Sequence, residues 1–218
     1  MVMRITATLI VCLGIGLVLS GCSRAYMSAA EALGYEKREQ LTDRVEDARD
    51  EQLEAREQFE SALEEFRALT GPIDEDLEEI YDRLRRQLKR SESRASGVSS
   101  KIDKVETVAD ALFKEWRKEL DEYQTDALRA ASEDQLERTE ARYGQLLGAM
   151  RNAESRMEPV LAAFSDQVLF LKHNLNARAI ASLQENVVDL EQEIGALIAE
   201  MNASIDEANA FIEEMGES

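Results

Sequence analysis

The sequence has few of the residues that build disulfides, metal sites and catalytic triads. It contains two cysteines and a single histidine, His173, among 218 residues. One histidine excludes a metal site with several histidine ligands and argues against a Ser-His-Asp arrangement. Cys12 lies in an apolar N-terminal segment, so a mature chain that begins at Cys22 has no second thiol for a disulfide or a redox site. Stability must therefore come from packing.

Proline and glycine, which interrupt regular helices, are also scarce. The chain has two prolines and ten glycines, and a third of its residues are charged. This composition is typical of long helices and argues against a sheet. A glycine-rich phosphate loop, a nucleophile elbow and a metalloprotease motif are all missing from the sequence. We therefore predict a protein that is not an enzyme and that uses no cofactor and no metal.

Basic residues are outnumbered by acidic ones. The chain has 26 Lys and Arg against 45 Asp and Glu, which gives a formal net charge of -19. Such a surface repels the phosphates of nucleic acids and anionic lipid headgroups. No nucleic acid partner is therefore predicted, and attachment to a membrane would depend on a covalent lipid.

The first 22 residues have the anatomy of a bacterial lipoprotein signal. One positive charge, Arg4, precedes an apolar run over Ile5–Val18 that is too short to span a bilayer comfortably. The run ends in Leu19-Ser20-Gly21-Cys22, which resembles a lipobox, whose cysteine becomes the first mature residue and carries lipid. We predict a signal peptide over residues 1–21 and a lipidation site at Cys22, which would hold the protein at a membrane.

The residue after the lipidated cysteine indicates which membrane would hold the lipid. Ser23, rather than an aspartate, resembles the pattern that permits export from the inner membrane. Two or more acyl chains anchor a protein stably, since each buried methylene adds about 0.8 kcal/mol. The expected location is therefore the periplasmic face of the outer membrane, with the inner membrane as the less favoured alternative.

Apolar and small residues recur at alternating steps of three and four, which predicts long amphipathic helices. The first stripe runs from Leu41 to Leu69 and ends at Thr70-Gly71-Pro72, and the second runs from Ile73 to Tyr123. The third helix is expected to start at Ser132, with Gln135 completing a capping box, and to continue through Pro159 with a kink. A turn is expected near residues 174–178, before a last stripe from Ile180 to Met215.

Four helices joined by short links favour antiparallel neighbours. The predicted fold class is all-α, an elongated up-down bundle or coiled coil of about four helices over residues 41–218. Parallel self-association is the competing use of the same heptads. Residues 22–40 are open to two interpretations, a membrane-proximal polar linker or a short helix near the bilayer marked by Tyr26, Ala30 and Leu33.

Three polar or small segments are candidates for function. Lys172, His173, Asn174 and Asn176 could form a polar contact site that responds to pH, or could simply cap helices at the expected turn. The segment Ser91–Ser100 has five serines and one glycine, and could be a hinge or a place of close helix contact.

The third candidate is a basic run over Arg83–Arg94. It could bind a phosphate-bearing lipid or a cell-wall polymer, or it could pair with the acidic first helix. If the first two helices fold back at Gly71-Pro72, the region Arg85–Arg90 should lie beside Gln52–Glu57. We expect this pairing to leave no free cationic surface.

Three tracts, 43–50, 55–59 and 170–177, resemble an uncharacterised family of Gram-negative lipoproteins known as a domain of unknown function. The resemblance covers nearly the whole mature chain and implies an address and an architecture but no activity. The expected role is a non-enzymatic envelope scaffold or partner-binding lipoprotein, whose partner is an envelope protein or a second copy of the chain. The alternative is a chaperone-like or regulatory binder that opens around a client.

Overall fold

The chain folds into an elongated rod of four long helices in this computed structural model. The structure describes the backbone of residues 21–68, 76–174 and 177–217, and the side chains of residues 36–68, 76–174 and 187–216. Residues 1–20, and with them nearly all of the predicted signal peptide, lie outside this description. The elements are α1 (Gly21–Ala68), α2 (Leu77–Glu119), the short 3-10 helix η1 (Leu120–Glu122), α3 (Asp126–His173) and α4 (Ala177–Glu217).

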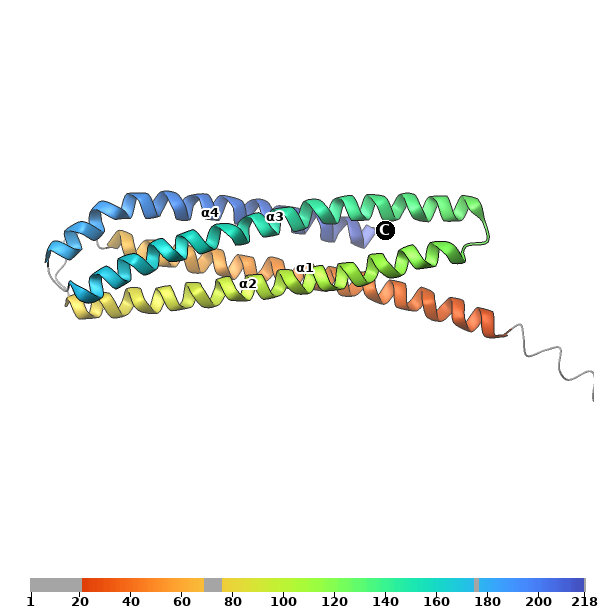
Figure 1. The fold of residues 1–218 in the computed structure, drawn as a ribbon, viewed down its shortest axis with the longest axis horizontal. Helices are drawn as coiled ribbons and strands as arrows, with labels where there is room; N and C mark the ends of the chain where they lie inside the picture. The colour runs from red at the N-terminus through yellow and green to blue at the C-terminus, as the bar shows by residue number, and fades with distance from the viewer. Residues whose placement is uncertain (1–20, 69–75, 175–176, 218) are drawn as a thin grey trace, which may run out of the picture.

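The helices pack as an antiparallel bundle in which α1 contacts α2, α2 contacts α3, α3 contacts α4, and α4 closes the bundle against α1. Helices α1 and α3 are diagonal to each other, as are α2 and α4, and in each of these pairs no described Cα atoms lie within 8 Å of each other. The predicted all-α bundle is therefore confirmed (Figure 1). Within the described segments, none of the helices is both long and apolar enough to cross a bilayer.

The core is a continuous apolar column built from the predicted stripes. Because a helix repeats every 3.6 residues, residues three and four apart share one face and are buried together. In α1, for example, the buried stripe comprises Leu41, Val45, Ala48, Ala55, Phe59, Ala62 and Phe66. Aromatic rings join helices that are diagonal or adjacent, as where Phe66 and Phe164 meet edge to face with ring centroids 4.7 Å apart.

Helix α1 is longer than predicted at its N-terminal end. It begins at Gly21 rather than near Leu41, so residues 22–40 are helical, which agrees with the second of the two interpretations of this segment. Its 48 residues correspond to a length of about 72 Å. Helix α4 ends earlier along the rod, and the first turns of α1 and the turn between α2 and α3 project beyond it (Figure 1).

Several predicted helix boundaries can be compared with the structure. Asp76 caps α2, because its Oδ1 accepts a hydrogen bond of 2.9 Å from the backbone N–H of Glu78. The predicted stop at Thr70-Gly71-Pro72 falls outside the described residues. Helix α3 continues through Pro159, as predicted, and the break between His173 and Ala177 confirms the predicted turn.

The predicted start of the third helix at Ser132 is wrong. Helix α3 begins at Asp126, six residues earlier, because 127–131 consists mostly of strong helix formers. Ser132 has a different role, since its Oγ accepts a hydrogen bond of 2.9 Å from the indole Nε1 of Trp116 on α2. Tyr123, the expected end of the second stripe, is exposed because the chain leaves the helix at η1.

Candidate functional site

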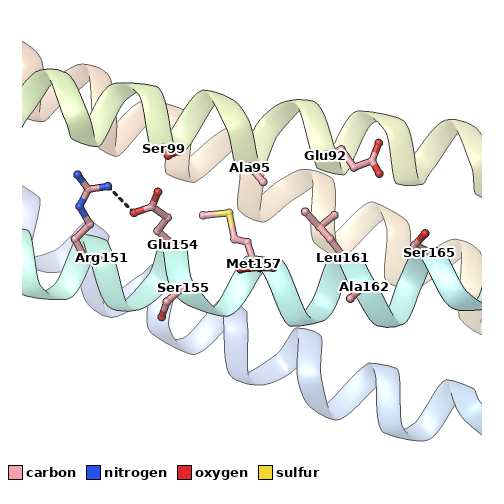
Figure 2. Close-up of a pocket in the computed structure, with 11 residues that line it drawn as sticks. Glu92, Ala95, Ser99, Arg151, Glu154, Ser155, Met157, Leu161, Ala162 and Ser165 are labelled. Atoms are coloured by element: carbon pink, nitrogen blue, oxygen red, sulfur yellow. Dashed lines mark hydrogen bonds and ion pairs between the residues drawn. The ribbon is translucent and has the colours of Figure 1, made fainter.

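A groove lies between α2 and α3 on the described surface. It has a volume of about 680 Å³ and lies midway along the rod (Figure 2). Helix α2 contributes small side chains here, so the two helices leave space between them. The lining residues are Glu92, Ala95 and Ser99 of α2, and Arg151, Glu154, Ser155, Met157, Glu158, Leu161, Ala162 and Ser165 of α3.

The groove has an apolar floor and an acidic rim. Met157 and Leu161 point from α3 toward Ala95 of α2 and form the floor (Figure 2). Glu92 and Glu158 lie on the rim, and neither makes an ion pair or hydrogen bond with any residue the structure describes. The groove therefore offers apolar contact along its length and unneutralised negative charge at its edge.

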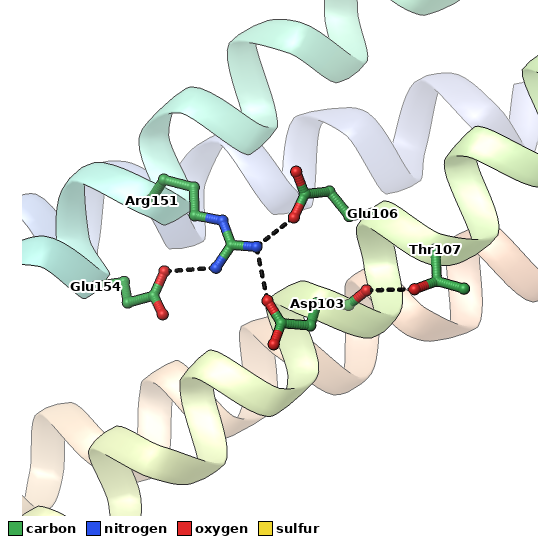
Figure 3. A network of polar contacts seen from close by, with 5 residues as sticks. All are labelled: Asp103, Glu106, Thr107, Arg151 and Glu154. Carbon is green, nitrogen blue, oxygen red and sulfur yellow. Dashed lines mark hydrogen bonds and ion pairs between the residues drawn. The ribbon is translucent and has the colours of Figure 1, made fainter.

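A network centred on Arg151 closes one end of the groove (Figure 3). Its guanidinium donates hydrogen bonds of 2.7 Å to Glu154 on α3 and to Asp103 on α2, and it also pairs with Glu106. Partial burial by itself would lower the pKa of Arg151, but these three carboxylates outweigh it and raise the pKa. Arg151 therefore stays charged and joins α2 to α3, and its charge is already neutralised.

The first sequence candidate, the polar cluster at the end of α3, occupies a helix terminus. Lys172 and His173 are exposed in the last turn, and His173 makes no hydrogen bond or ion pair with any described residue. Asn174 caps the helix, because its side-chain Nδ2 donates to the carbonyl oxygen of Phe170 at 2.9 Å. Asn176 lies outside the described residues. This geometry is that of a helix cap.

The predicted lipidation site, Cys22, lies in the second position of α1. Its side chain is outside the described set, so its lipidation remains a prediction.

The segment Ser91–Ser100 is an uninterrupted part of α2, with Ser91 and Val98 fully buried in the core. The small residues therefore allow close contact with α1 on one side and leave the groove on the other.

The basic run pairs with the first helix only at its two ends. Arg83 donates to Glu65 at 3.0 Å, and Arg94 donates to Glu51 at 3.1 Å and also pairs with Glu54. The residue numbers in these pairs add to between 145 and 148. The observed register therefore differs from the expected sum of about 142 by about one helical turn.

Four basic residues inside the run do not behave as expected. Arg85, Arg86, Lys89 and Arg90 are exposed, and none makes an ion pair or hydrogen bond with any residue the structure describes. The predicted ion pairs between these four and α1 are therefore absent among the described residues, although Arg90 lies on the α1 side of α2, seven residues from both Arg83 and Gly97. The chain therefore does have a free cationic surface.

The groove itself was not predicted. Its signal in the sequence is Ala95 and Ser99, two small residues at positions of α2 that face another helix. Small residues indicate either closer packing or a hollow, and only the path of α3 decides between them. The neighbour on the other side of this segment, α1, comes close, whereas α3 does not fill the space.

The fold and the site together define a class of protein. It is an antiparallel rod of four long helices with an acid-rimmed groove along its side. The chain belongs to the family described as "Protein of unknown function (DUF2959)", whose family model matches residues 26–215. No curated protein and no solved structure matches the chain. The predicted membership in a family of unknown function is confirmed, and the lipoprotein assignment stays a prediction.

Proposed function

We propose that this protein is a membrane-anchored lipoprotein of the bacterial envelope and acts as a non-enzymatic scaffold that binds a partner protein in the α2–α3 groove. The groove carries the proposal, because it combines an apolar floor with unpaired carboxylates at Glu92 and Glu158. These features favour a partner segment that presents apolar side chains toward the floor and Lys or Arg toward the rim.

The proposed anchor is lipid on Cys22, with the protein facing the periplasm from the outer membrane. The motif at Leu19–Cys22 and the serine at position 23 support this location. Because α1 begins at Gly21, the helix would rise directly from the lipidated residue, without a flexible tether. The groove would then be held at a set position relative to the bilayer.

The anchor is tested by replacing Cys22 with Ser in the full chain. We expect precursor or released protein in place of a mature form that sediments with membranes. Sedimentation of a processed Cys22→Ser protein with the outer membrane, as for the wild type, would overturn the lipid assignment. Matched Cys12→Ser protein should fractionate like the wild type, because Cys12 lies within the predicted signal peptide.

The groove is tested with a photoreactive amino acid at Ala162, an exposed residue of its lining. We expect crosslinking in cells to a defined envelope protein, and loss of that product in Glu92→Lys/Glu158→Lys protein. Ala141 is an exposed alanine on the same helix, outside the groove lining, and serves as the matched control position. Identical products from positions 162 and 141 would reject the groove as the binding site.

A regulatory or chaperone-like binder is the second candidate function. The observation that favours it is the position of the groove, which borders the small residues Ala95 and Ser99 of α2. In that case the α2–α3 seam would open to admit a client. Hydrogen exchange distinguishes the two, because uniformly slow exchange over 91–100 would reject opening, whereas fast exchange confined to that segment would support it.

A further inference from the structure

Seven basic residues of α2 have no ion pair or hydrogen bond with any residue whose side chain the structure describes. Most Lys and Arg whose side chains are described form an ion pair. Outside α2 only two do not, namely Arg38, which lies over the ring of Trp116, and Lys172. The unpaired residues of α2, all exposed, are Arg85, Arg86, Lys89, Arg90, Lys104, Lys114 and Lys118.

Most of these cations share the outer surface of α2. The core of α2 follows Leu84, Ser91, Val98 and Val105. The helical repeat places six of the seven cations on the outer side and Arg90 on the flank toward α1, seven residues from Arg83. Three exposed serines, Ser93, Ser96 and Ser100, fill the outer positions between Arg90 and Lys104. We call this surface, from Arg85 to Lys118, the basic face of α2.

Helix α4 has the opposite charge. No Lys, Arg or His occurs from residue 179 to the C-terminus. Four of its carboxylates pair with arginines on neighbouring helices, namely Glu191, Glu200, Glu207 and Glu214. Four others are exposed and have no described partner, with Glu193 on the flank toward α3, seven residues before Glu200: Asp189, Glu193, Asp206 and Glu213.

The outward side of α4 also has small residues between its unpaired carboxylates. Gly195, Ala196, Ala199 and Ala203 are all exposed there. A side chain added at Gly195 would meet nothing within 4 Å, so this side is open. We call the surface from Asp189 to Glu213 the acidic face of α4. Its small residues would let another helix approach closely, while its carboxylates supply the charge.

The two faces cannot meet within one molecule. Helices α2 and α4 are diagonal in the bundle and have no described Cα atoms within 8 Å of each other, so their outer faces point in opposite directions. Both helices run the same way along the rod (Figure 1). They have 43 and 41 residues, so they also match in length.

We propose that the chain assembles side by side with copies of itself, the basic face of α2 in one copy packing on the acidic face of α4 in the next. The copies would be parallel, with their N-termini at the same end. The inference deepens the proposed scaffold role by naming a partner, but it uses neither the groove nor the lipid. The two faces differ and lie on opposite sides of the molecule, so two bound copies still have one basic face and one acidic face free. Further copies can add to these free faces, and a row results.

The spacing of residues gives a specific register for this contact. Adding 103 to a residue number on α2 aligns Ser93, Ser96 and Ser100 with Ala196, Ala199 and Ala203. The same alignment places Arg85 and Lys89 one residue from Asp189 and Glu193, and Lys104 one residue from Asp206. Opposite charges that flank a close helix contact set its orientation and register.

The register also fixes the shift between copies. Facing residue numbers add to 148 between α1 and α2 and to 258 between α1 and α4, so residues level with each other in α2 and α4 differ by 110. An offset of 103 therefore displaces the next copy by seven residues, about 10 Å, along the rod.

A second copy fits the basic face better than a flat anionic surface does. A membrane or other extended polyanion that contacts α2 would also approach the helices on either side of it. These helices belong to a protein of net charge -19, which repels such a surface. The acidic face of α4 is instead a single ridge, so it can contact α2 alone. Complementary charge on a matching ridge therefore favours the chain itself.

The test is disulfide crosslinking between two tagged full-length copies in cell membranes, one with Ser100→Cys and the other with Ala203→Cys. We expect a mixed dimer well above the yield of a control pair that combines Ser100→Cys with Ala141→Cys. Neither variant alone should form it. A yield equal to the control, or stronger crosslinking of Ser100→Cys with itself, would overturn the proposal.

Charge reversal tests the cause of the contact. Arg85→Glu/Lys89→Glu in the Ser100→Cys copy should abolish the mixed dimer, and Asp189→Lys/Glu193→Lys in the Ala203→Cys copy should restore it. All four residues are exposed or outward and unpaired, so circular dichroism should show unchanged folding. Equal crosslinking before and after reversal would refute the pairing.

Two other outcomes separate this inference from competing ones. If Arg85→Glu/Lys89→Glu protein loses binding to phosphatidylglycerol vesicles while the mixed dimer stays at the control yield, the face binds lipid and the self-association proposal fails. Membrane fractionation and crosslinking from position 162 are measured on the same samples. Loss of membrane attachment, or the lack of a crosslinked partner at position 162, would count against the proposed function and not against the contact between copies.

Discussion

The carboxylate of Glu51 on α1 occupies the space that a side chain at Gly97 on α2 would need. A Cβ atom added to Gly97 would lie 2.6 Å from Oε1 of Glu51, closer than such atoms approach each other. The same oxygen accepts a hydrogen bond of 3.1 Å from Arg94. The only glycine in the Ser91–Ser100 segment thus admits a carboxylate between two helices.

Replacing Gly97 with Ala should have two opposing effects. Alanine favours the helix by about 1 kcal/mol, whereas its methyl group displaces the flexible end of Glu51 and weakens the bond to Arg94. In Glu51→Ala protein the carboxylate is absent, so only the favourable effect of alanine on the helix remains. We expect Gly97→Ala to stabilise Glu51→Ala protein by about 1 kcal/mol and the wild type by less, as measured by urea unfolding of all four proteins. Identical gains in both backgrounds would contradict this account.

A second prediction concerns a buried polar pair. Ser204 of α4 donates to Oε1 of Gln52 of α1 at 2.9 Å, both residues are fully buried, and Nε2 of Gln52 has no partner. Ser204→Ala alone should lower the free energy of unfolding by about 1 kcal/mol, because it leaves Gln52 with a second unmet group. Gln52→Leu/Ser204→Ala should be as stable as the wild type or more so, since no polar group is then stranded. A double variant less stable than Ser204→Ala would show that the pair is needed for packing.

The third prediction concerns pH. Burial raises the pKa of Glu119, and the neighbouring Glu115 and Glu122 raise it further. The folded state therefore holds the proton more tightly than the unfolded state, so the charged side chain reduces stability once the pH exceeds the folded pKa. Glu119→Gln should raise stability at neutral pH by less than about 1 kcal/mol, and the gain should vanish below pH 4.5, the ordinary pKa. Thermal unfolding of both proteins at pH 7 and pH 4 measures this, and a gain independent of pH would disprove it.

The fourth prediction uses the only tryptophan in the chain. The guanidinium of Arg38 on α1 lies 4.2 Å from the ring centroid of Trp116, which is 7% exposed. Arg38→Ala should uncover one face of the ring, shift its fluorescence emission to the red and lower stability by about 0.5 to 1 kcal/mol. Arg44→Ala is the matched control, because Arg44 pairs only with Asp47 on its own helix. Equal emission from both variants would rule out the stacking.

The sequence predicts the fold well because the bundle depends on periodicity, which is a local property. The stripe from Leu41 to Phe66 is buried as expected, and Pro159 lies inside α3 because the pattern of Met157 and Val160 continues across it. Ser132 was misjudged because a serine that begins a helix and one that accepts a bond from Trp116 look alike in sequence. That distinction depends on a residue of another helix.

The candidate sites were harder to predict for the same reason. The basic run was identified, but Arg85 and Lys89 lie on the outer side of α2 and have no partner among the described residues. The groove depends on a hollow between Ala95 and Leu161, residues far apart in the chain. Neither the depth of a hollow nor the direction of a lone charge is encoded in one helix.

Because α1 is uninterrupted from Gly21 to Ala68, it sets the distance between Cys22 and the groove. Gly97, at the level of the groove, faces Glu51, which is 29 residues beyond Cys22 along α1, a rise of about 44 Å. A lipid on Cys22 would therefore hold the groove about that far from the acyl chains if the rod stands upright, and nearer if it tilts. With the proposed anchor, a partner bound in the groove would have to span that distance from the bilayer or lie at that height.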